Sequence, residues 1–485
     1  MKVNYQIQNT TFFSVLSDDQ IEMIYMAALR VLESTGVRVH APEGVALLAD
    51  AGGHVSDGNL VRIPSHAVKS ALQTAPERIA LYGRDGNREM MLEKNKVYYG
   101  TGSDCPFILD SRTKERRCFT FDDVANAAKI ADALPNIDFF MSLGLVSDVP
   151  TFTYDRHQFL AMVANTTKPL IITAVDKAGM ADIHEMCRVI RGGEEEFKRR
   201  PFMALYAEPS SPLNHTKTAV EKLLYAAEHN IPVIYTPCPI AGATAPATLA
   251  GILVQALAEC LSGLVMAQQK NRGCPVIIGG VVSIMDMGRL IYSYGAPELH
   301  LLSAAFTDIC KWLNLPNFST GGCSDSKVID QQAAIESALS ILFATLSGAN
   351  LVHDIGYLEY ALVGSYDMLV MTDEIIGMVK HIAKGIRVDE ESLALAVIHN
   401  VGPGGNFLAE EHTLKHFREE FWFPKLINRQ NYEKWVENGS TSLANRVNKK
   451  VLNILQDYQP TLLADNVLEE LREIIDKADK GRISV

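Results

Sequence analysis

The sequence predicts an α/β protein: a (β/α)8 barrel with a small N-terminal α+β cap and a mostly helical C-terminal extension. The main observation is an alternation, in which eight short apolar runs each precede a longer segment with helical spacing. Continuous runs of this length are typical of strands buried on both faces, as in a parallel sheet under helices. Eight such units over roughly 290 residues fit a barrel of this class. An open doubly wound sheet is the alternative, but no GxGxxG follows the first run.

The expected boundaries are 1–90 for the cap, 91–388 for the barrel and 389–485 for the extension. In the cap, segments 17–35 and 65–74 have helical spacing, and 52–63 predicts a hairpin that turns at Asp57 and Gly58. In the extension, the glycine-rich loop at 402–405 lacks the Lys-Ser/Thr pair of a phosphate-binding loop, so no nucleotide site is expected there.

The eight predicted barrel strands lie at 97–102, 137–145, 168–175, 202–209, 231–239, 275–283, 316–322 and 350–358. Between them, Thr120 and Asp123 predict a helix start of the capping-box kind, and Pro297 stands where a first helical residue would. Segment 330–348 predicts a further helix, which ends at Gly348. Its apolar positions share one amphipathic stripe, formed by Ile335, Ala338, Leu339, Leu342 and Leu346.

Charge and cysteine content exclude several classes of protein. The 485-residue chain carries 45 basic and 57 acidic residues, a net charge of −12, so no basic face for a phosphate backbone is expected. Its eight cysteines are scattered singly, which indicates a reducing compartment. Residues 1–13 have no apolar signal segment, and the apolar stretch 248–268 contains Gln255 and Glu259, which favours a buried helix over a membrane span. We therefore expect a cytoplasmic protein with no nucleic-acid or membrane partner.

The reactive groups of a (β/α)8 barrel lie at its mouth, where the strands end and the loops to the helices begin. The predicted strand ends are rich in carboxylates and aromatic rings, among them Tyr99, Asp104, Tyr206, Glu208, Tyr235 and Tyr357. Ring faces attract cations, and a desolvated cation gains roughly 2 kcal/mol per good contact. The sequence therefore predicts a site for a small cationic molecule, with the alternative that some of these rings pack outward under the helices.

Histidines give a second set of candidates. His353 is followed by Asp354, which would fix its tautomer; the imidazole could donate a hydrogen bond, ligate a metal, act as a general acid, or be a buried core histidine. His412 and His416 have the i, i+4 spacing of two metal ligands on one helix face. The Glu of an HExxH motif is missing there and no third ligand is near in sequence, so no metal site is expected.

The run 321–327 (GGCSDSK) stands at the end of the seventh predicted strand. It combines a glycine pair, Gly321 and Gly322, with the side chains of Asp325 and Lys327. Without a Cβ atom, the glycines let the backbone approach a bound ligand closely. A tight strand-to-helix turn before Asp330 explains the same residues, and both interpretations stay open.

Seven segments form recognisable motifs: 100–106 (GTGSDCP), 134–138 (LPNID), 168–170 (KPL), 242–246 (GATAP), 321–327 (GGCSDSK), 353–357 (HDIGY) and 412–418 (HTLKHFR). With these motifs the chain resembles the trimethylamine methyltransferase family, and within it the branch that lacks pyrrolysine. The resemblance covers nearly the whole chain. It implies a TIM barrel that passes a methyl group from a methylated amine to the cobalt of a corrinoid (cobalamin) carried by a separate protein.

This chain contains only standard residues, which points away from trimethylamine and toward quaternary amines such as glycine betaine. A quaternary nitrogen leaves as a neutral tertiary amine, so neither a general acid nor a bound metal is required at the nitrogen, and no tightly bound metal is expected. The resemblance also suggests a homo-oligomer. With the strand-end positions it gives three groups of site residues: His353 and Asp104 as catalytic; Tyr99, Tyr206, Glu208, Tyr235, Lys327 and Tyr357 as substrate-binding; and Gly321, Gly322 and Asp325 toward the corrinoid.

Two rival functions belong to other classes. One is a zinc-dependent corrinoid methyltransferase, in which Cys238, Cys323 or His353 would help to activate a thiol or an alcohol. The other is a non-catalytic betaine-binding protein. Metal analysis distinguishes the first rival, and an assay for methyl transfer distinguishes the second.

Overall fold

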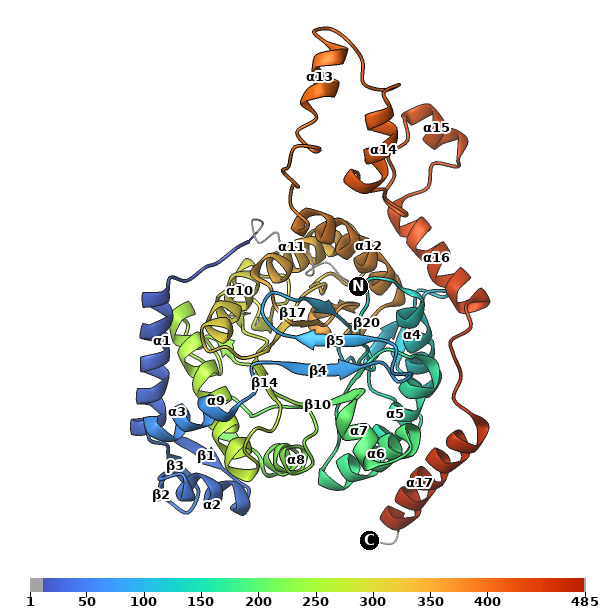
Figure 1. The fold of residues 1–485 in the computed structure, drawn as a ribbon. Coiled ribbons are helices and arrows are strands. Elements are labelled where there is room, and N and C mark those ends of the chain that lie inside the picture. The colour runs from blue at the N-terminus through green and yellow to red at the C-terminus, as the bar shows by residue number, and fades with distance from the viewer. Residues whose placement is uncertain (1–11, 484–485) are drawn as a thin grey trace.

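The computed structural model describes residues 12–483, whose central feature is a closed ring of parallel strands surrounded by helices (Figure 1). Seven strands pair in the order β6-β18-β17-β14-β12-β10-β9, and every pairing is parallel. Their bounds are β6 Tyr98–Tyr99, β9 Leu170–Ile172, β10 Met203–Ala207, β12 Val233–Tyr235, β14 Val276–Gly279, β17 Asn317–Thr320 and β18 Leu351–His353. Each lies inside a predicted run, so the order and number of the buried runs define the barrel.

The remaining predicted strand, 137–145, closes the ring in an irregular form. Phe139 bridges to Gly100 beyond β6, and Phe140 bridges to Leu170 of β9, both in parallel. Backbone hydrogen bonds link the segment to both neighbours, for example Phe140 N to Pro169 O at 3.0 Å. The regular strand is lost because the segment twists sharply at Leu143, whose φ is +64°. The predicted (β/α)8 barrel is confirmed, with one strand reduced to bridges.

Eight helices follow the eight strands in turn and cover the outside of the ring. They are α4 Phe121–Ala133, α5 Tyr154–Asn165, α6 Lys177–Arg191, α8 Lys217–Glu228, α9 Leu249–Lys270, α10 Pro297–Trp312, α11 Gln331–Ser347 and α12 Tyr366–Ala383. Thr120 forms the predicted capping box with Asp123, and Pro297 is the first residue of α10. Among the helices of residues 12–483, α9 alone is long and apolar enough to cross a membrane, and most of it is buried inside the protein, as expected of a core helix.

The barrel interior is filled from its N-terminal end. Each strand contributes an inward side chain to one apolar cluster: Tyr98, Phe139, Ile171, Ala204, Ile234, Ile277, Phe318 and Leu351. The hairpin of β4 (Ile79–Tyr82) and β5 (Glu89–Leu92) adds Ile79, Leu81, Met90 and Leu92 to this cluster and lies across that end of the barrel (Figure 1). The interior is therefore a packed core that leaves only the opposite end, the mouth, for function.

The other N-terminal elements lie beside α9 rather than over the mouth (Figure 1). They are α1 Asp18–Arg30, continued by a π turn at Val31–Thr35, β1 Val37–Val39, α2 Pro42–Asp50, β2 His54–Ser56, β3 Leu60–Arg62 and α3 Ser65–Thr74. The predicted hairpin is present, and Asp57 and Gly58 at its turn both have positive φ. β1 also pairs in parallel with β11 (Asn214–His215), which ties this layer to the barrel.

Two small sheets rise at the mouth from the loops that follow the barrel strands. β7 (Phe107–Leu109) and β8 (Arg116–Cys118), after the first strand, join β19 (Tyr357–Leu358) and β20 (Val363–Gly364), after the last. A 3-10 turn, Glu359–Ala361, separates the last two. Across the mouth, β13 (Ile240–Ala241) pairs with β15 (Ser283–Asp286), and β15 with β16 (Ile291–Tyr292). These sheets hold the loops that carry most of the candidate site.

The C-terminal elements form two parts, one that projects from the barrel and one that runs along its outside. α13 (Leu395–Val401), α14 (Glu411–Glu420) and α15 (Tyr432–Glu437) project from one side (Figure 1). α16 (Leu443–Asp457) then packs on α4 and α12, and α17 (Asp465–Ile483) packs on α5 and α6. The short helix α7 (Glu194–Arg199) follows α6.

One predicted helix has its faces reversed. α11 begins after Asp330 and ends at Gly348 as predicted, but Ile335 and Leu339 of its apolar stripe are exposed to solvent. The face turned to the barrel carries small and polar residues, such as Ser337, Ser340 and Ala344. An amphipathic stripe normally packs on a core, so the outward stripe of α11 is a departure to be explained.

Candidate active site

The first strand and the last meet at the mouth through Asp104 and Tyr357. The Tyr357 hydroxyl donates a 2.7 Å hydrogen bond to Asp104 Oδ1 and accepts one from the Asp104 backbone N–H at 3.0 Å. Ser103 Oγ donates to the same Oδ1 at 3.1 Å. The contact requires Gly102, because a Cβ atom there would lie 2.1 Å from the Tyr357 oxygen. Tyr357 is buried, whereas the Asp104 side chain reaches solvent, so this pair forms part of the wall of the mouth.

His353 and Asp354 form a second pair at the end of β18. His353 Nδ1 lies 2.8 Å from the carbonyl oxygen of Ser319, which can only accept, so Nδ1 carries a proton. Its Nε2 lies 3.1 Å from Asp354 Oδ1, and Thr320 Oγ1 donates to Asp354 Oδ2 at 2.6 Å. Asp354 has φ +73°, a strained conformation for a residue other than glycine.

The His353–Asp354 pair is buried, and this decides where its proton lies. Burial lowers the pKa of His353 to about 4. The hydrogen bond to Ser319 opposes this shift, but its effect is smaller. Burial raises the pKa of Asp354 well above its usual range, against the hydrogen bonds from Thr320 and Tyr294. Both shifts favour a neutral imidazole and a protonated carboxyl. In that state Nε2 accepts a hydrogen bond from Asp354 and the pair carries no net charge.

The fourth strand contributes Tyr206 and Glu208 to the mouth. The Tyr206 hydroxyl donates to Glu208 Oε2 at 2.8 Å. Burial raises the pKa of Glu208 to about 7, and the charge of Asp104 adds to this rise. The hydrogen bond from Tyr206 lowers the pKa but does not offset the burial. The Glu208 side chain still reaches solvent. It is therefore an accessible acid that changes charge near neutral pH.

Aromatic rings contact these residues in two groups. In one, the Tyr206 ring centroid lies 6.3 Å from that of His353, and Phe318 lies 4.0 Å from His353. In the other, Tyr294 packs edge-on against Tyr292 at 5.1 Å and against Tyr357 at 6.4 Å. Rings around accessible carboxyls are the surroundings that an organic cation prefers.

Two predicted substrate residues, Tyr99 and Tyr235, point away from the mouth, which corrects the expectation. The Tyr99 hydroxyl lies 2.8 Å from Thr345 Oγ1 of α11, and the Tyr235 hydroxyl lies 2.8 Å from His215 Nδ1. The Tyr235 ring also lies so close to Gly263 of α9 that a Cβ atom there would be 2.1 Å from it. Alternate residues of a strand face opposite sides, so both rings pack outward under the helices.

The run 321–327 also differs from its predicted role. Lys327 is exposed, and its ammonium donates to the Asp325 carbonyl at 2.8 Å and lies 5.5 Å from the centroid of the Tyr360 ring. Asp325 accepts from Ser293 Oγ at 2.5 Å and from Tyr294 N at 2.7 Å, which fixes the Tyr294 loop. Gly322 has φ +74°, and a Cβ atom there would lie 2.8 Å from Ile355 and Thr372; one on Gly321 would lie 3.0 Å from Val352. The tight-turn interpretation fits this run.

Three mouth residues escaped the sequence reasoning: Tyr292, Tyr294 and Thr320. Tyr292 ends the short strand β16 and Tyr294 follows it, in the long connection between β14 and α10 where no barrel strand ends. Their i, i+2 spacing in an extended stretch was an available signal, since it places both side chains on one face. Thr320 lies at the end of β17 and could have been inferred as a partner for an adjacent buried acid.

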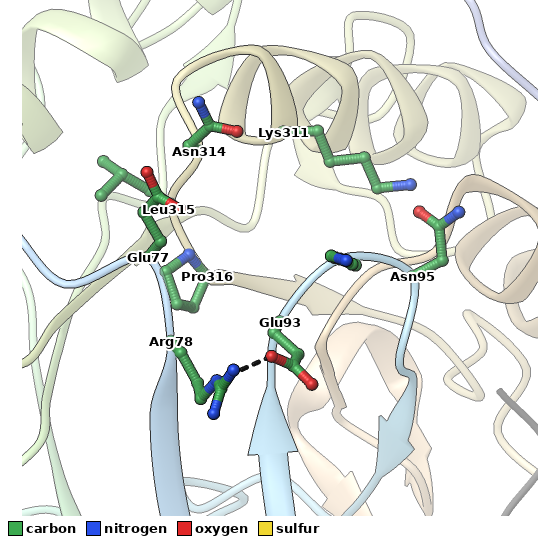
Figure 2. A pocket seen from close by; sticks show the side chains of 9 residues that line it. Glu77, Arg78, Glu93, Asn95, Lys311, Asn314, Leu315 and Pro316 are labelled. Carbon is green, nitrogen blue, oxygen red and sulfur yellow. Dashed lines mark hydrogen bonds and ion pairs between the residues drawn. The ribbon is translucent and has the colours of Figure 1, made fainter. Parts of the chain in front are cut away.

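Within residues 12–483 no three His, Cys, Asp or Glu side chains lie together in a way that could hold a metal ion. Cys238 contacts the Tyr292 hydroxyl at 3.8 Å and Cys323 contacts Thr320 Oγ1 at 4.0 Å, so the two thiols named for a zinc site have separate partners. A pocket of about 350 Å³ lies at the opposite end of the barrel, between the β4–β5 hairpin and the end of α10 (Figure 2). It contains the 2.8 Å ion pair of Arg78 with Glu93 and is separate from the mouth.

Fold and site together define a (β/α)8-barrel protein with an acidic mouth lined by aromatic rings. A profile of the trimethylamine methyltransferase family matches residues 1–481. The chain belongs to this family, and it is a methyltransferase.

Relatives with known names match almost the whole chain. Trimethylamine methyltransferase MttB of Methanosarcina barkeri is 33% identical, over 98% of this chain and 97% of that protein. MttB of Desulfitobacterium hafniense is 32% identical, over 96% and 93%. A glycine betaine methyltransferase of Desulfitobacterium hafniense is 31% identical, over 97% and 98%. The crystal structure of the Methanosarcina barkeri monomethylamine methyltransferase has a TM-score of 0.52 at 13% identity, covering 95% of this chain and 92% of that one, which confirms the fold.

Proposed function

We propose that this protein takes a methyl group from the nitrogen of a quaternary amine, glycine betaine or a related betaine, and passes it to the cobalt of a corrinoid on a separate protein. The observation that carries the proposal is that Glu208 and Asp104 are each hydrogen-bonded to a tyrosine of an aromatic cluster, Tyr206 and Tyr357. A relative named as a glycine betaine methyltransferase supports the substrate class.

In this proposal the chain's own residues bind and orient the substrate. The quaternary nitrogen lies between the rings of Tyr206 and Tyr294, and the negative charges of Asp104 and ionised Glu208 balance its charge. A betaine carboxylate needs a hydrogen-bond donor, and Tyr206 or Tyr357 supplies one when its hydroxyl turns from Glu208 or Asp104 to the ligand. His353 fixes the position of the Asp354 proton.

The transfer needs no proton at the nitrogen. The carbon–nitrogen bond breaks with its electron pair remaining on nitrogen, so a neutral tertiary amine leaves. A corrinoid partner supplies the nucleophilic cobalt that bonds to the methyl carbon. The protein's contribution is to hold one methyl carbon open to the mouth and to keep the nitrogen beside the acidic side chains there. Gly321, Gly322 and Asp325 do not fit a corrinoid contact, because they are crowded or occupied by internal hydrogen bonds.

Two further parts of the proposal concern its setting. We place the enzyme in the cytoplasm, because all eight cysteines are free in the structure and suit a reducing compartment. We also propose that the enzyme is a homo-oligomer.

The decisive experiment is a spectroscopic assay of cobalt methylation. The purified full chain is mixed with a reduced corrinoid protein and a panel of amines that includes glycine betaine, choline, tetramethylammonium and trimethylamine. Conversion with a quaternary amine and not with trimethylamine is expected. Binding of betaine by calorimetry without conversion by any corrinoid protein would favour the binding-protein alternative. One tightly bound zinc per chain, lost together with activity on chelation, would favour the zinc-dependent one.

A further inference from the structure

The loop that brings Tyr294 to the mouth is not part of a barrel strand and depends on contacts from elsewhere in the fold. It runs from the end of β16 to the start of α10, over residues 293–296. Tyr294 is buried, and its ring packs edge-on against that of Tyr357, with the ring centroids 6.4 Å apart. A cation gains from an aromatic ring only when the ring face stands at the right place. The residues that hold this loop therefore matter for the mouth.

Asp325 is the first of these residues, and both of its carboxyl oxygens bind the loop. Oδ2 accepts from Ser293 Oγ at 2.5 Å, and Oδ1 accepts from the Tyr294 backbone N–H at 2.7 Å. The residue before it, Ser324, contacts the other tyrosine, because its backbone N–H donates to the Tyr357 carbonyl at 3.0 Å. One short turn therefore holds the backbone of both tyrosines.

Glu336 of α11 holds this turn in place. Its Oε2 accepts from Ser324 Oγ at 2.5 Å and from the Asp325 backbone N–H at 2.8 Å, and its Oε1 accepts from Gln332 Nε2 at 2.8 Å. Glu336 is half-buried and is the only acidic or basic residue of α11. A carboxyl oxygen can accept two hydrogen bonds at once, so a single oxygen of Glu336 fixes both the side chain of Ser324 and the backbone of Asp325.

Glu336 also contacts the tyrosine loop directly, at Gly295. A Cβ atom on Gly295 would lie 2.3 Å from Glu336 Cδ and 2.4 Å from Glu336 Oε1. The φ of Gly295 is not positive, so this position requires glycine for space and not for an unusual backbone conformation. The backbone next to Tyr294 therefore rests against the carboxyl group. Glu336 thus reaches the loop in two ways, directly and through Asp325.

The same contacts explain why α11 turns a polar face to the barrel. Ser340 Oγ accepts from the Gly322 backbone N–H at 2.9 Å, and Ser337 Oγ lies 3.0 Å from Thr372 Oγ1 of α12. Together with Glu336, these side chains bind the segment that follows β17. An apolar face on this side would leave the buried N–H groups of that segment without acceptors, which is costly. The reversed orientation of α11 therefore serves the turn that supports the mouth.

We propose that Glu336 is a positioning residue for the amine site. It keeps the ring of Tyr294 in the wall of the mouth, directly at Gly295 and through Asp325, and it does not touch the substrate. Without this carboxyl group the Asp325 N–H loses its acceptor, and the loop is free to move away from Tyr357. The effect on amine affinity rests on the proposed function, whereas the effect on the place of the Tyr294 ring does not.

Two measurements on the full chain test these two effects separately. The place of the ring is followed by fluorine NMR of protein labelled with fluorotyrosine, in which the Tyr294 resonance is the one lost in Tyr294→Phe. The affinity is the Kd of tetramethylammonium, measured by calorimetry. Glu336→Ala is expected to shift or broaden the Tyr294 resonance and to raise the Kd roughly 5- to 10-fold. Glu336→Gln, whose amide oxygen can accept the same two hydrogen bonds, should keep the resonance in place and the Kd within about 2-fold of wild type.

Glu374→Ala on α12 is the matched control. Glu374 is a buried carboxyl group that accepts from the backbone N–H groups of residues 425, 426 and 427 at 2.8, 2.8 and 3.2 Å. Its loss should lower the thermal midpoint, as in Glu336→Ala, but leave the Tyr294 resonance and the Kd unchanged. Gly295→Ala should weaken binding as well. Combined with Glu336→Ala it should bind no more weakly than Glu336→Ala alone, because the added methyl group then has room.

An unmoved Tyr294 resonance or an unchanged Kd in a folded Glu336→Ala variant would overturn the proposal. Equal effects of Glu336→Ala and Glu374→Ala on the Kd would also overturn it, because they would indicate a general loss of stability. Should Glu336→Ala fail to fold, Gly295→Ala decides, since it disturbs the same contact from the side of the loop. A displaced Tyr294 resonance in a protein whose wild type binds no tetramethylammonium would contradict the proposed function and leave the positioning role of Glu336 intact.

Discussion

The hydroxyl of Tyr357 lies 2.7 Å from Asp104 Oδ1, and this contact joins residues 253 positions apart in the chain. It links the loop after the first barrel strand to the segment after the last. The Tyr357 hydroxyl also accepts a hydrogen bond from the Asp104 backbone N–H, so it holds both the carboxylate and the backbone of this loop in place. The contact therefore fixes an acidic side chain at the point where the closed ring meets the mouth.

Removing this hydroxyl is expected to impair catalysis without unfolding the protein. Tyr357→Phe keeps the buried ring but frees Asp104, and kcat/KM for the quaternary amine should fall roughly 10-fold. Tyr235→Phe is the matched control: it removes a buried hydroxyl that bonds His215 outside the barrel and should lower stability by about 1 kcal/mol with KM unchanged. Equal kinetic effects of the two variants would contradict the assignment of Asp104 to the site.

Substrate affinity should depend on pH through Glu208, whose pKa is raised to about 7 by burial. As pH rises through this value the carboxyl loses its proton and gains the negative charge that attracts a cation. The Kd of tetramethylammonium, measured by calorimetry, should therefore fall roughly 3- to 10-fold between about pH 6 and about pH 8.

The same titration with variants identifies the group responsible. Glu208→Gln should bind more weakly at the high end of the range and show little dependence on pH. Glu195→Gln, at an exposed position on α7, should titrate like wild type. A dependence on pH that survives in Glu208→Gln would assign the titration to another group.

Lys327→Ala should leave turnover unchanged. The ammonium lies at the surface, bonded to the Asp325 carbonyl, so its loss costs the mouth no charge. The measurement is kcat/KM with a betaine, compared with wild type over a range of salt concentration. A large rise in KM for betaine alone, with tetramethylammonium unaffected, would assign Lys327 as a donor to the betaine carboxylate.

The fold was predictable because burial leaves a direct trace in the sequence. Runs buried on both faces are continuously apolar, and eight of them appear in order. The reversed helix α11 was not predictable, because an apolar stripe indicates that a face is covered but not by what. The irregular form of the strand 137–145 was not predictable for a similar reason. Its apolar composition indicates that the segment is buried, whereas the twist at Leu143 depends on the residues packed around it.

The candidate site was partly predictable from strand ends. Asp104, Glu208 and His353 lie where strand-end reasoning placed them. Tyr99 and Tyr235 fail because a continuous apolar run does not show which alternate residues face inward. Gly100 and Gly102 contained the missing information. They alternate with Tyr98 on the side of the strand that faces the barrel interior, so Tyr99 faces outward. Tyr292 and Tyr294 depend on a loop held by Asp325, a contact that no local pattern shows.

Gly102 should tolerate no side chain. A Cβ atom there would lie 2.1 Å from the Tyr357 oxygen and 2.5 Å from Asp354 Oδ1, so Gly102→Ala must displace both walls of the mouth. We expect the variant to fold, with its thermal midpoint lowered, and to lose at least about 10-fold in affinity for tetramethylammonium. Gly481→Ala, where the added methyl group meets nothing within 4 Å, should match wild type in both measurements. Unaltered affinity in Gly102→Ala would show that the substrate binds elsewhere.

The position of the proton in the His353–Asp354 pair gives the most discriminating prediction. If Asp354 is protonated and donates to Nε2, an amide at this position can donate in the same way, and asparagine also tolerates the φ of +73°. Asp354→Asn should therefore keep kcat/KM within about 5-fold of wild type, whereas Asp354→Ala, which leaves Nε2 and Thr320 Oγ1 without their partner, should lose at least about 100-fold. An ionised carboxylate paired with an imidazolium predicts the opposite for asparagine, because the variant would leave a buried cation unpaired. The nitrogen chemical shifts of His353 separate the two states directly, and a doubly protonated imidazole at pH 7 would overturn the assignment.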